Sequence, residues 1–466
     1  MTSTVLAPAQ WAQNELSLVE LGDRRRTQRL MKIATRLAQS PGGTLPQALP
    51  DWGELKAAYR FFSQPKNHYE AILRPHWQRT LEQCQEPGEY LLIEDTTFLD
   101  YSAHRATQEL GINGSRGRGL RLHSTLALAV KGWDEEQRPQ TELVGLLHQH
   151  CWAQAPRPKG EARSKCFARP HRCSQRWAQV LKEGPAPAAQ SRWIWVADRE
   201  ADFYEPIQRC QQRGVDFIIR ARTLRRVAGA AGGLLDVLEQ GQVLGEQEIE
   251  LRARPGMAAR RAVVQLRSHR VSLPGPWRPG GFLEELKPLN VLEVKELHPP
   301  QGVEPLHWVL LTSLPCQDLE AARRVAGRYG GRWHIEEFHK ALKSGAGVEE
   351  SQLEQAYRLQ SLIAVLSLVA LRLLHTKLAA RVPQQPPLEP EVIAPEALQI
   401  LEARVGKPEG PWTASTFWLA VAKLGGFIGR KSDGSPGWKN IWRGWQRLIW
   451  MTQGLETLNQ LKNKCG

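Results

Sequence analysis

The chain has 466 residues, of which 41% are hydrophobic and 24% charged, a composition typical of globular proteins. Its 62 Lys and Arg residues outnumber its 48 Asp and Glu residues, which gives a formal net charge of +14. Such an excess favours a polyanionic partner, most simply nucleic acid, although many basic proteins bind none. The 7 cysteines are scattered, which argues against a disulfide framework and indicates a reducing cytoplasm. Cys166, His171 and Cys173 resemble half a zinc site, but no second pair has ligand spacing, so isolated thiols are favoured.

The length predicts about three domains, at roughly 150 residues per domain. The N-terminus lacks the basic and apolar regions of a signal peptide. The most apolar segment, 362–374, is interrupted by Ser367 and Arg372 and is too short to span a bilayer. We therefore expect a cytoplasmic protein with no membrane partner.

The first 70 residues are predicted to be helical. Asp23 is a suitable N-cap for a helix that begins at Arg24 and continues to about Leu37. Four cations on this helix share one face as a basic stripe: Arg25, Arg29, Lys32 and Arg36. The opposite face is apolar: Leu30, Ile33, Ala34 and Leu37. A stripe of one sign favours contact with a DNA backbone, and the alternative is a charged face that is merely solvated.

Residues from about 70 to 222 predict an α/β core with a mixed sheet. The expected strands are 90–95, 120–130, 143–151, 193–198 and 215–222. Helices are expected at 173–183 and directly after residue 198. The first and fourth strands each end in an aspartate, Asp95 and Asp198. If these strands are neighbours, the two carboxylates meet; otherwise each is an ordinary turn or cap residue.

Residues 223–313 predict a β-rich insertion, because alternating segments are separated there by turns rich in Pro and Gly. The expected strands are 247–253, 262–267, 291–297 and 308–311. The insertion carries arginines that are consistent with a surface over nucleic acid: Arg252, Arg254, Arg260, Arg261, Arg267 and Arg270.

The stretch 329–343 combines one acid with cations on a predicted helix. At about 100° per residue, one narrow face carries Tyr329, Arg332, Glu336 and Lys343. The opposite face is apolar and suited to burial. A carboxylate among cations suits an oxygen-ligated metal beside a phosphodiester, and the alternative is an amphipathic helix with ordinary salt pairing. Gly330 and Gly331 weaken helix formation, so the helix could begin only near Arg332, which would separate Tyr329 from this face.

The last part of the chain is predicted to be helical, apart from a Pro-rich linker at 382–395. An apolar helix is expected at 358–378. In the final segment Trp438, Trp442 and Trp445 recur at helical spacing, which is typical of a core or a dimer surface.

Three acids stand out together: Asp95, Asp198 and Glu336. Two Mg²⁺ ions about 3.5–4 Å apart, held by carboxylates, can activate a water or a 3′-hydroxyl and stabilise the leaving oxygen. Mg²⁺ favours oxygen ligands, so three acids without Cys or His suffice.

Three blocks resemble those of bacterial DDE transposases: Asp95-Thr-Thr, Asp198-Arg-Glu-Ala-Asp and Tyr329-x2-Arg332-x3-Glu336-x6-Lys343. The similarity is to the insertion-sequence-four family, in its transposon-five-like branch, and covers nearly the whole chain. The most specific block is Ile335-Glu-Glu-Phe-His-Lys-Ala-x-Lys-x-Gly-Ala-Gly347. Further blocks occur in order: Leu21-Gly-Asp-Arg-Arg-Arg-Thr-x-Arg-Leu, Ala58-Tyr-Arg-Phe, Leu143-Val-Gly-Leu-Leu-His-Gln, Trp308-Val-Leu-Leu-Thr-Ser and Ala422-Lys-Leu-Gly-Gly-Phe.

The resemblance implies an α/β fold in three parts. An α-helical domain at 1–70 would bind transposon ends. An RNase H-like catalytic domain at 71–380, with a mixed five-stranded sheet, would be interrupted by the β-insertion at about 223–313. An α-helical domain at 381–466 would dimerise.

The resemblance also implies cut-and-paste transposition of an insertion sequence. A homodimer would bind and synapse terminal inverted repeats, cleave through a hairpin intermediate, and join 3′-OH ends to target DNA. Asp95, Asp198 and Glu336 would hold two Mg²⁺ ions, with Mn²⁺ expected to substitute. The partner would be double-stranded DNA, with no small-molecule substrate, and the bacterial protein would be nucleoid-associated when DNA-bound.

Further site residues follow from the same resemblance. Tyr329, Arg332 and Lys343 match phosphate-binding and hairpin-handling positions. Trp308 matches a tryptophan that stabilises a flipped base, which needs an aromatic partner. Arg220 and Arg222 match basic residues near the flipped nucleotide.

Two other functions remain as alternatives. A non-catalytic end-binding inhibitor of transposition would need neither the metal ligands nor both ends of the chain. A host nuclease of RNase H-like fold would cut without joining and would not need a synapsis domain. The intact acids and the terminal blocks favour the active transposase over both.

Overall fold

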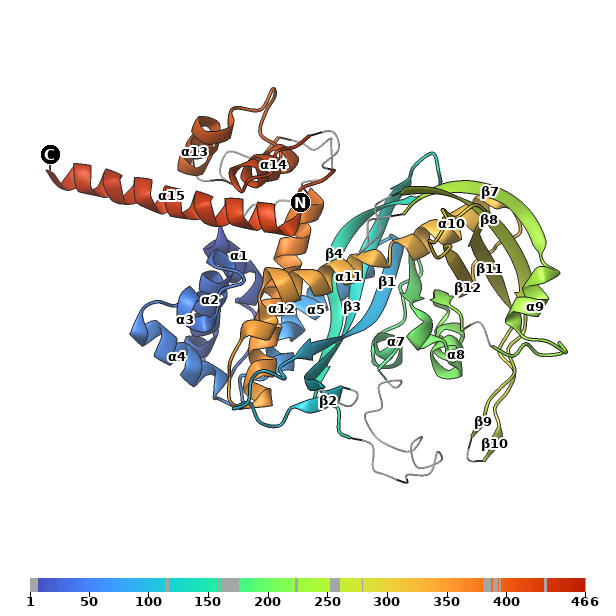
Figure 1. The fold of residues 1–466 in the computed structure, drawn as a ribbon. Coiled ribbons are helices and arrows are strands. Elements are labelled where there is room, and N and C mark those ends of the chain that lie inside the picture. Colours follow the sequence, from blue (N-terminus) through green and yellow to red (C-terminus); the bar gives the residue numbers. More distant parts are fainter. Residues whose placement is uncertain are drawn as a thin grey trace.

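The computed structural model describes residues 7–113, 117–156, 160, 176–222, 225–251, 260–278, 280–379, 387–388, 393, 395–430 and 434–465. A large mixed sheet occupies the middle of the molecule, with helices on both faces and helical regions beside it (Figure 1). The candidate half zinc site at Cys166, His171 and Cys173 lies outside the described residues, as do Arg252 and Arg254.

The N-terminal region is helical, as predicted. Its helices are α1 (Pro8–Leu16), α2 (Arg24–Gln39), α3 (Leu45–Ala48), α4 (Trp52–Phe62) and α5 (Tyr69–Cys84). The predicted cap is confirmed, because the Asp23 side chain accepts a hydrogen bond from the backbone N–H of Arg25 at 2.9 Å. The predicted apolar face of α2 is buried, which packs this helix into the same hydrophobic core as the sheet.

The central sheet has ten strands rather than the five predicted for the core. They are β1 (Gly88–Asp100), β2 (Gly111–Asn113), β3 (Gly117–Trp133), β4 (Pro139–Trp152), β5 (Ser191–Ala197), β6 (Asp216–Arg220), β7 (Gln242–Leu251), β8 (Arg260–Val271), β11 (Leu289–Glu296) and β12 (His307–Thr312). The order is β2-β3-β1-β5-β6-β12-β11-β8-β7, and β4 pairs with β3. Strands from the predicted insertion therefore extend the same sheet, because β12 pairs antiparallel with β6.

Both faces of the sheet are covered, which explains why its central strands are nearly continuous apolar runs. Leu91 and Ile93 of β1 face the core shared with the N-terminal helices and the long helices that follow the sheet. Leu92 faces a second core with Trp193 and Trp195 of β5. This second core includes α7 (Gln179–Glu183), α8 (Tyr204–Arg213) and α9 (Leu234–Glu239) (Figure 1). Within its described part, the helix predicted at 173–183 is confined to α7.

A small hairpin, β9 (Trp277–Arg278) with β10 (Gly281–Phe282), projects from the sheet region (Figure 1). Four cysteines in the described residues are buried and form no disulfide: Cys84, Cys151, Cys210 and Cys316. This agrees with the absence of a disulfide framework in that part of the chain.

The stretch that carries Glu336 is two helices, not one. Helix α10 (Leu319–Gly330) ends at a turn, and α11 (Trp333–Lys340) begins after Arg332. A Cβ at Gly331 would lie 3.3 Å from Leu91 Cδ1 and 3.0 Å from the Arg328 carbonyl oxygen, so glycine permits close packing on β1. A π-helical turn (Ala341–Gly345) and a 3₁₀ turn (Val348–Glu350) follow α11. A single helix over 329–343 was therefore the wrong prediction, whereas a start near Arg332 is confirmed.

Helix α12 (Ala356–Ala379) is longer than the apolar segment that we had judged too short to span a bilayer. By length and composition alone it could cross a membrane, and it is the one such helix within the described residues. Inside the protein, however, 83% of its most apolar 18-residue window is buried, as in a core helix.

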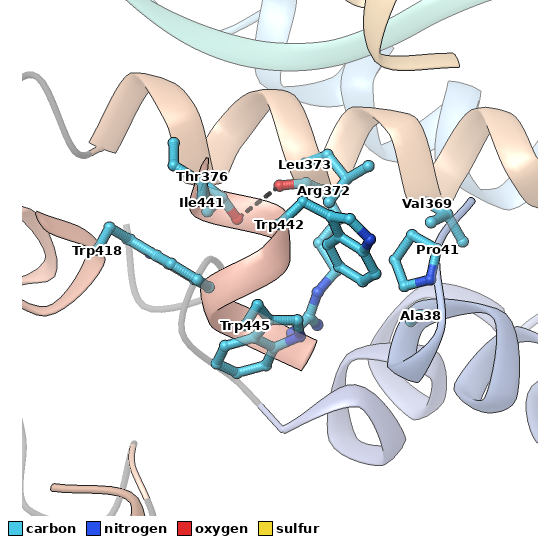
Figure 2. Close-up of a pocket in the computed structure, with 10 residues that line it drawn as sticks. All are labelled: Ala38, Pro41, Val369, Arg372, Leu373, Thr376, Trp418, Ile441, Trp442 and Trp445. Atoms are coloured by element: carbon cyan, nitrogen blue, oxygen red, sulfur yellow. Dashed lines mark hydrogen bonds between the residues drawn. The ribbon is translucent and has the colours of Figure 1, made fainter. Parts of the chain in front are cut away.

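The C-terminal helices are α13 (Pro395–Val405), α14 (Ala414–Leu424) and α15 (Trp438–Cys465), which lie together beside α12 (Figure 1). Trp438 and Trp445 are each only 9% exposed, which confirms a core role for these tryptophans. Figure 2 shows a small pocket between α2, α12, α14 and α15, where Trp442 and Trp445 lie beside Arg372 and Trp418 lines the pocket farther away. Its volume of about 10 Å³ admits no more than one water molecule, so it is a packing joint rather than a ligand site.

Candidate functional site

Asp95 and Asp198 lie side by side because β1 and β5 are parallel neighbours. Their pairing extends to Glu94 opposite Ala197, and the next residue on each chain segment is the aspartate. Asp198 follows β5 and caps a 3₁₀ turn (Arg199–Ala201), where it accepts a hydrogen bond from the Glu200 N–H at 2.8 Å. Asp95 is not at a strand end as predicted, because β1 continues to Asp100 by pairing with β3. The condition under which the two carboxylates would meet is nevertheless fulfilled, because the two strands are neighbours.

Glu336 and Arg332 approach these aspartates from the start of α11. The Arg332 Nη1 atom lies 3.7 Å from Asp95 Oδ2, and the same guanidinium forms an ion pair with Glu336. We call Asp95, Asp198, Glu336 and Arg332 the acid site. Segments far apart in the sequence thus bring three carboxylates around one cation.

The charge balance of the acid site is unusual at Asp95. Burial raises the pKa of this carboxyl; Arg332 opposes the rise, and the charges of Asp198 and Glu336 add to it, so the pKa is about 6. Asp95 therefore carries a partly buried charge that Arg332 alone does not fully compensate. Buried carboxylates with raised pKa values are typical of functional sites.

The acid site fits Mg²⁺ in its donor chemistry, since it offers carboxylate oxygens and no thiol. The incomplete compensation of Asp95 is the observation that favours a cation at this position. Glu336, however, is engaged by Arg332. Across the parts of the chain that the structure describes, no three His, Cys, Asp or Glu side chains form a ready-made metal cluster.

Two aromatic side chains border the acid site. Tyr329, in the last turn of α10, is 5% exposed, and burial raises its pKa. Its ring stacks edge to face against Trp308 of β12, with centroids 5.1 Å apart and an interplanar angle of 69°. Tyr329 is in α10 and so does not share a helix face with Glu336 of α11. It nevertheless lies near Arg332, whose charge opposes the rise in the pKa of Tyr329.

Lys343 does not share the acid site's contacts. It lies in the π-helical turn, where its Nζ donates to the Phe98 carbonyl oxygen at 2.6 Å and pairs with Glu349 at 3.3 Å. The π-helical turn therefore separates Lys343 from the face of α11 on which Arg332, Glu336 and Lys343 were predicted to lie together. Lys343 instead contacts the C-terminal part of β1 at Phe98.

Arg220 and Arg222 lie on the side of the acid site formed by β6. Arg220 donates to the His307 carbonyl oxygen at 3.0 Å, next to Trp308. The Arg222 side chain donates to the Arg199 carbonyl oxygen at 3.2 Å, directly after Asp198. Asp202 holds this segment, because it accepts the Arg222 N–H at 2.7 Å and pairs with Arg225.

The basic stripe of α2 is partly neutralised by α4. Glu54 of α4 pairs with Lys32 at 2.7 Å and with Arg36 at 3.1 Å. Arg25 lies 3.5 Å from its own cap, Asp23, with its side chain 89% exposed. Arg29 forms no ion pair within the described residues. Arg25 thus keeps a largely exposed side chain although it pairs with Asp23, and Arg29 is the cation of the stripe that has no acidic partner in the described part of the chain.

Sequence reasoning missed His339, a buried residue of α11 whose Nδ1 lies 3.9 Å from Asp95 Oδ2. A signal was present, because a Glu and a His three positions apart on a helix share a face. It also missed Glu94, the residue before Asp95, which accepts hydrogen bonds from Thr125 at 3.0 Å and from the Ala178 N–H at 2.7 Å. Contacts of this kind depend on strands that are distant in the sequence.

One comparison with known proteins bears on the N-terminal helices. Residues 8–67, which contain α1 to α4 and the basic stripe, match the family model described as transposase DNA-binding. The match covers this region alone, and it agrees with the exposed cations on α2. The chain therefore carries a transposase DNA-binding domain, and this match supports its interpretation as a DNA transposase.

Proposed function

We propose that the chain is a DDE transposase of the insertion-sequence-four family, in its transposon-five-like branch. The observation that carries this proposal is the convergence of Asp95, Asp198 and Glu336 in a chain with a transposase DNA-binding domain. The order of the first sheet strands supports an RNase H-like core, since β4, β3 and β1 are antiparallel and β5 and β6 continue in parallel.

In this proposal Asp95, Asp198 and Glu336 hold two Mg²⁺ ions, with Mn²⁺ able to substitute. When bound, the ions supply Lewis-acid activation of water or a 3′-hydroxyl and neutralise charge on the leaving oxygen. The protein contributes the position of the carboxylates, which the β1–β5 register and α11 determine. Arg332, now paired with Glu336, is placed to hold a phosphate oxygen once that carboxylate is engaged elsewhere.

The aromatic and basic residues around the acid site suit the handling of a DNA end. Trp308, held edge to face by Tyr329, offers a ring on which an unstacked base can pack. Arg220 and Arg222 flank this ring and the Asp198 turn, where they can hold backbone phosphates. We propose that one strand is nicked by water, that the freed 3′-OH attacks the opposite strand to form a hairpin and release the flanking DNA, and that a second water opens the hairpin. The regenerated 3′-OH would then attack a target phosphodiester at the same acid site, with the target's own 3′-oxygen as the leaving group.

The remaining parts of the chain have roles in assembly. The N-terminal domain binds the terminal inverted repeats through the α2 stripe, chiefly Arg25 and Arg29, with Lys32 and Arg36 beside them. The C-terminal helices form the dimer that synapses two ends. This places α15, which extends from the body in Figure 1, at the surface available to a second copy.

Strand cleavage tests the proposal. Purified protein is incubated with Mg²⁺ and a labelled duplex that carries the flanking inverted repeat, and the products are separated on a denaturing gel. We expect nicks and hairpinned ends with the wild type and none with Glu336→Gln. Glu350→Gln removes an exposed acid from the nearby 3₁₀ turn and serves as the matched control, with wild-type cleavage expected. Retarded DNA without cleavage in Mg²⁺ or Mn²⁺ would instead indicate an end-binding inhibitor.

A further inference from the structure

His339 is a buried polar side chain with no assigned role beside the acid site. It lies on α11, three positions after Glu336, and is only 7% exposed. Its Nε2 atom is buried and has no hydrogen-bond partner in the described part of the chain. Its Nδ1 atom faces Asp95 Oδ2 at 3.9 Å. Burial of an imidazole without hydrogen bonds is unfavourable, so the residue requires a physical explanation.

The partner atom on Asp95 is specific. Asp95 Oδ1 accepts the backbone N–H of Thr96 at 2.8 Å, which fixes one carboxylate oxygen to β1. Oδ2 is the oxygen that faces α11, with Arg332 Nη1 at 3.7 Å and His339 Nδ1 at 3.9 Å. Both distances exceed that of a direct hydrogen bond. The orientation of the Asp95 carboxylate is therefore determined on one side only.

Of the two groups that face Oδ2, Arg332 is already engaged by Glu336. His339 is held by burial and can approach Oδ2 by a small rotation of the carboxylate or contact it through one water. A carboxylate is an acceptor only, whereas an imidazole carries at least one N–H, so the pair is complementary.

We propose that His339 is a positioning residue for Asp95, which donates its Nδ1–H to Oδ2 and so orients the carboxylate in the loaded acid site. The inference rests on the proposed function, because it assigns a role toward the cation that Asp95 would hold. Carboxylates that ligate metals are themselves hydrogen-bonded, and these outer partners set the direction of the remaining lone pairs. The Thr96 N–H and His339 would then hold the two oxygens from opposite sides.

Two substitutions separate positioning from packing. In His339→Asn the amide nitrogen occupies the place of Nδ1, and in His339→Gln it falls near the place of Nε2. We expect His339→Asn to retain most of the Mn²⁺ affinity of the full-length protein, measured by electron paramagnetic resonance of free Mn²⁺. We expect His339→Gln to lose about 10–100-fold, which is the usual effect of removing an outer partner. Cleavage of the flanked duplex at saturating DNA should follow the same order.

The outcomes distinguish this inference from the proposed function. If both variants bind Mn²⁺ like the wild type while the wild type cleaves, the positioning role is overturned and the function stands. Equal losses in both variants would overturn it in favour of a packing role. A wild type that neither binds Mn²⁺ nor cleaves would overturn the proposed function, and the inference with it. If His339→Gln does not fold, His339→Phe, which fills similar space without a donor, takes its place with the same expectation.

Discussion

Two partly buried carboxylates in this chain, Glu15 and Asp95, have pKa values that are shifted in opposite directions. Glu15 of α1 lies 3.0 Å from His76 Nδ1 and 2.5 Å from Arg79 Nη2, both on α5. Burial alone would raise its pKa, but His76 and Arg79 outweigh burial and lower the pKa to about 2. Asp95 has one partly engaged arginine, and its pKa is about 6. The ion pairs between α1 and α5 compensate the charge of Glu15, whereas Arg332 compensates the charge of Asp95 only in part.

The two carboxylates are expected to affect the stability of the folded protein in opposite directions. Glu15 connects the N-terminal helices to the α5 helix that packs on the sheet, so its ion pairs stabilise the association of the two regions. The incompletely compensated charge of Asp95 destabilises the folded protein until something neutralises it. Unfavourable groups of this kind are expected at functional sites rather than in structural joints.

The largest expected effect comes from removing an acid of the acid site. Asp198→Asn should reduce strand cleavage by about 10³-fold or more, because metal-held acids supply several kcal/mol of transition-state stabilisation. Single-turnover cleavage of the labelled duplex measures this loss. Binding of the inverted-repeat duplex should be unchanged, and loss of binding as well would show that Asp198 is structural.

Substitution of Glu15, between α1 and α5, should change the stability of the protein rather than strand cleavage. Glu15→Gln should lower the free energy of unfolding by about 3 kcal/mol at pH 7, because the pKa of Glu15 is about 2 in the folded protein against an ordinary value of 4.5. A lowered folded-state pKa stabilises above the unfolded pKa and loses that contribution as the pH falls toward 2. The difference between the variant and the wild type, measured by chemical denaturation, should therefore shrink below pH 4.5. A difference that is constant with pH would contradict the assigned ion pairs.

Asp95→Asn should have the opposite sign. The folded-state pKa of about 6 lies above the ordinary value of 3.8, so the ionised carboxylate destabilises the fold at higher pH. Without divalent cations, the substitution should raise the free energy of unfolding by at most about 3 kcal/mol at pH 7.5, from about 2 pKa units. The gain should disappear as the pH falls from 6 to 4. A loss of stability at pH 7.5 would contradict the comparison with Glu15.

The smallest effects are expected on DNA binding. Arg29→Ala should reduce the slope of log affinity against log salt by about one unit, the contribution of one phosphate contact. Lys32→Ala is the matched comparison on the same stripe and should change the slope less, because Glu54 already pairs with Lys32. The affinity for the inverted-repeat duplex is measured by fluorescence anisotropy at salt concentrations from about 50 to about 200 mM. Equal effects would show that Glu54 releases Lys32 when DNA binds.

Local signals in the sequence were sufficient for much of the fold. The Asp23 cap, the apolar face of α2 and the apolar runs of β1 and β5 follow from neighbouring residues. That Asp95 lies beside Asp198 depended on the pairing of β1 with β5, which the sequence left as a condition. Pairing between distant segments was not accessible in the same way. The pairing of β12 with β6 enlarged the sheet, and the packing of Gly331 against Leu91 could not be read from the local pattern either, although the two glycines did indicate a helix start near Arg332.

The same limit applies to the site. The three acids were selected from apolar runs followed by an aspartate, from the pattern at 329–343 and from the family resemblance, although β1 continues past Asp95 and 329–343 is not one helix. Their electrostatic balance was not predictable. Arg332 was assigned to a shared face, yet its engagement of Glu336 depends on side-chain geometry. Glu54 neutralises part of the basic stripe from another helix, which periodicity along α2 cannot reveal.

We propose that a divalent cation compensates the remaining negative charge of the acid site. Thermal unfolding of the full chain with increasing Mg²⁺, at pH 7.5 and constant ionic strength, tests it most directly. A ligand that binds only the folded state stabilises it in proportion to the logarithm of its concentration above Kd. We predict that Mg²⁺ raises the Tm of the wild type and leaves that of Asp95→Asn nearly unchanged. An equal rise in both proteins, or no rise in the wild type, would contradict the account.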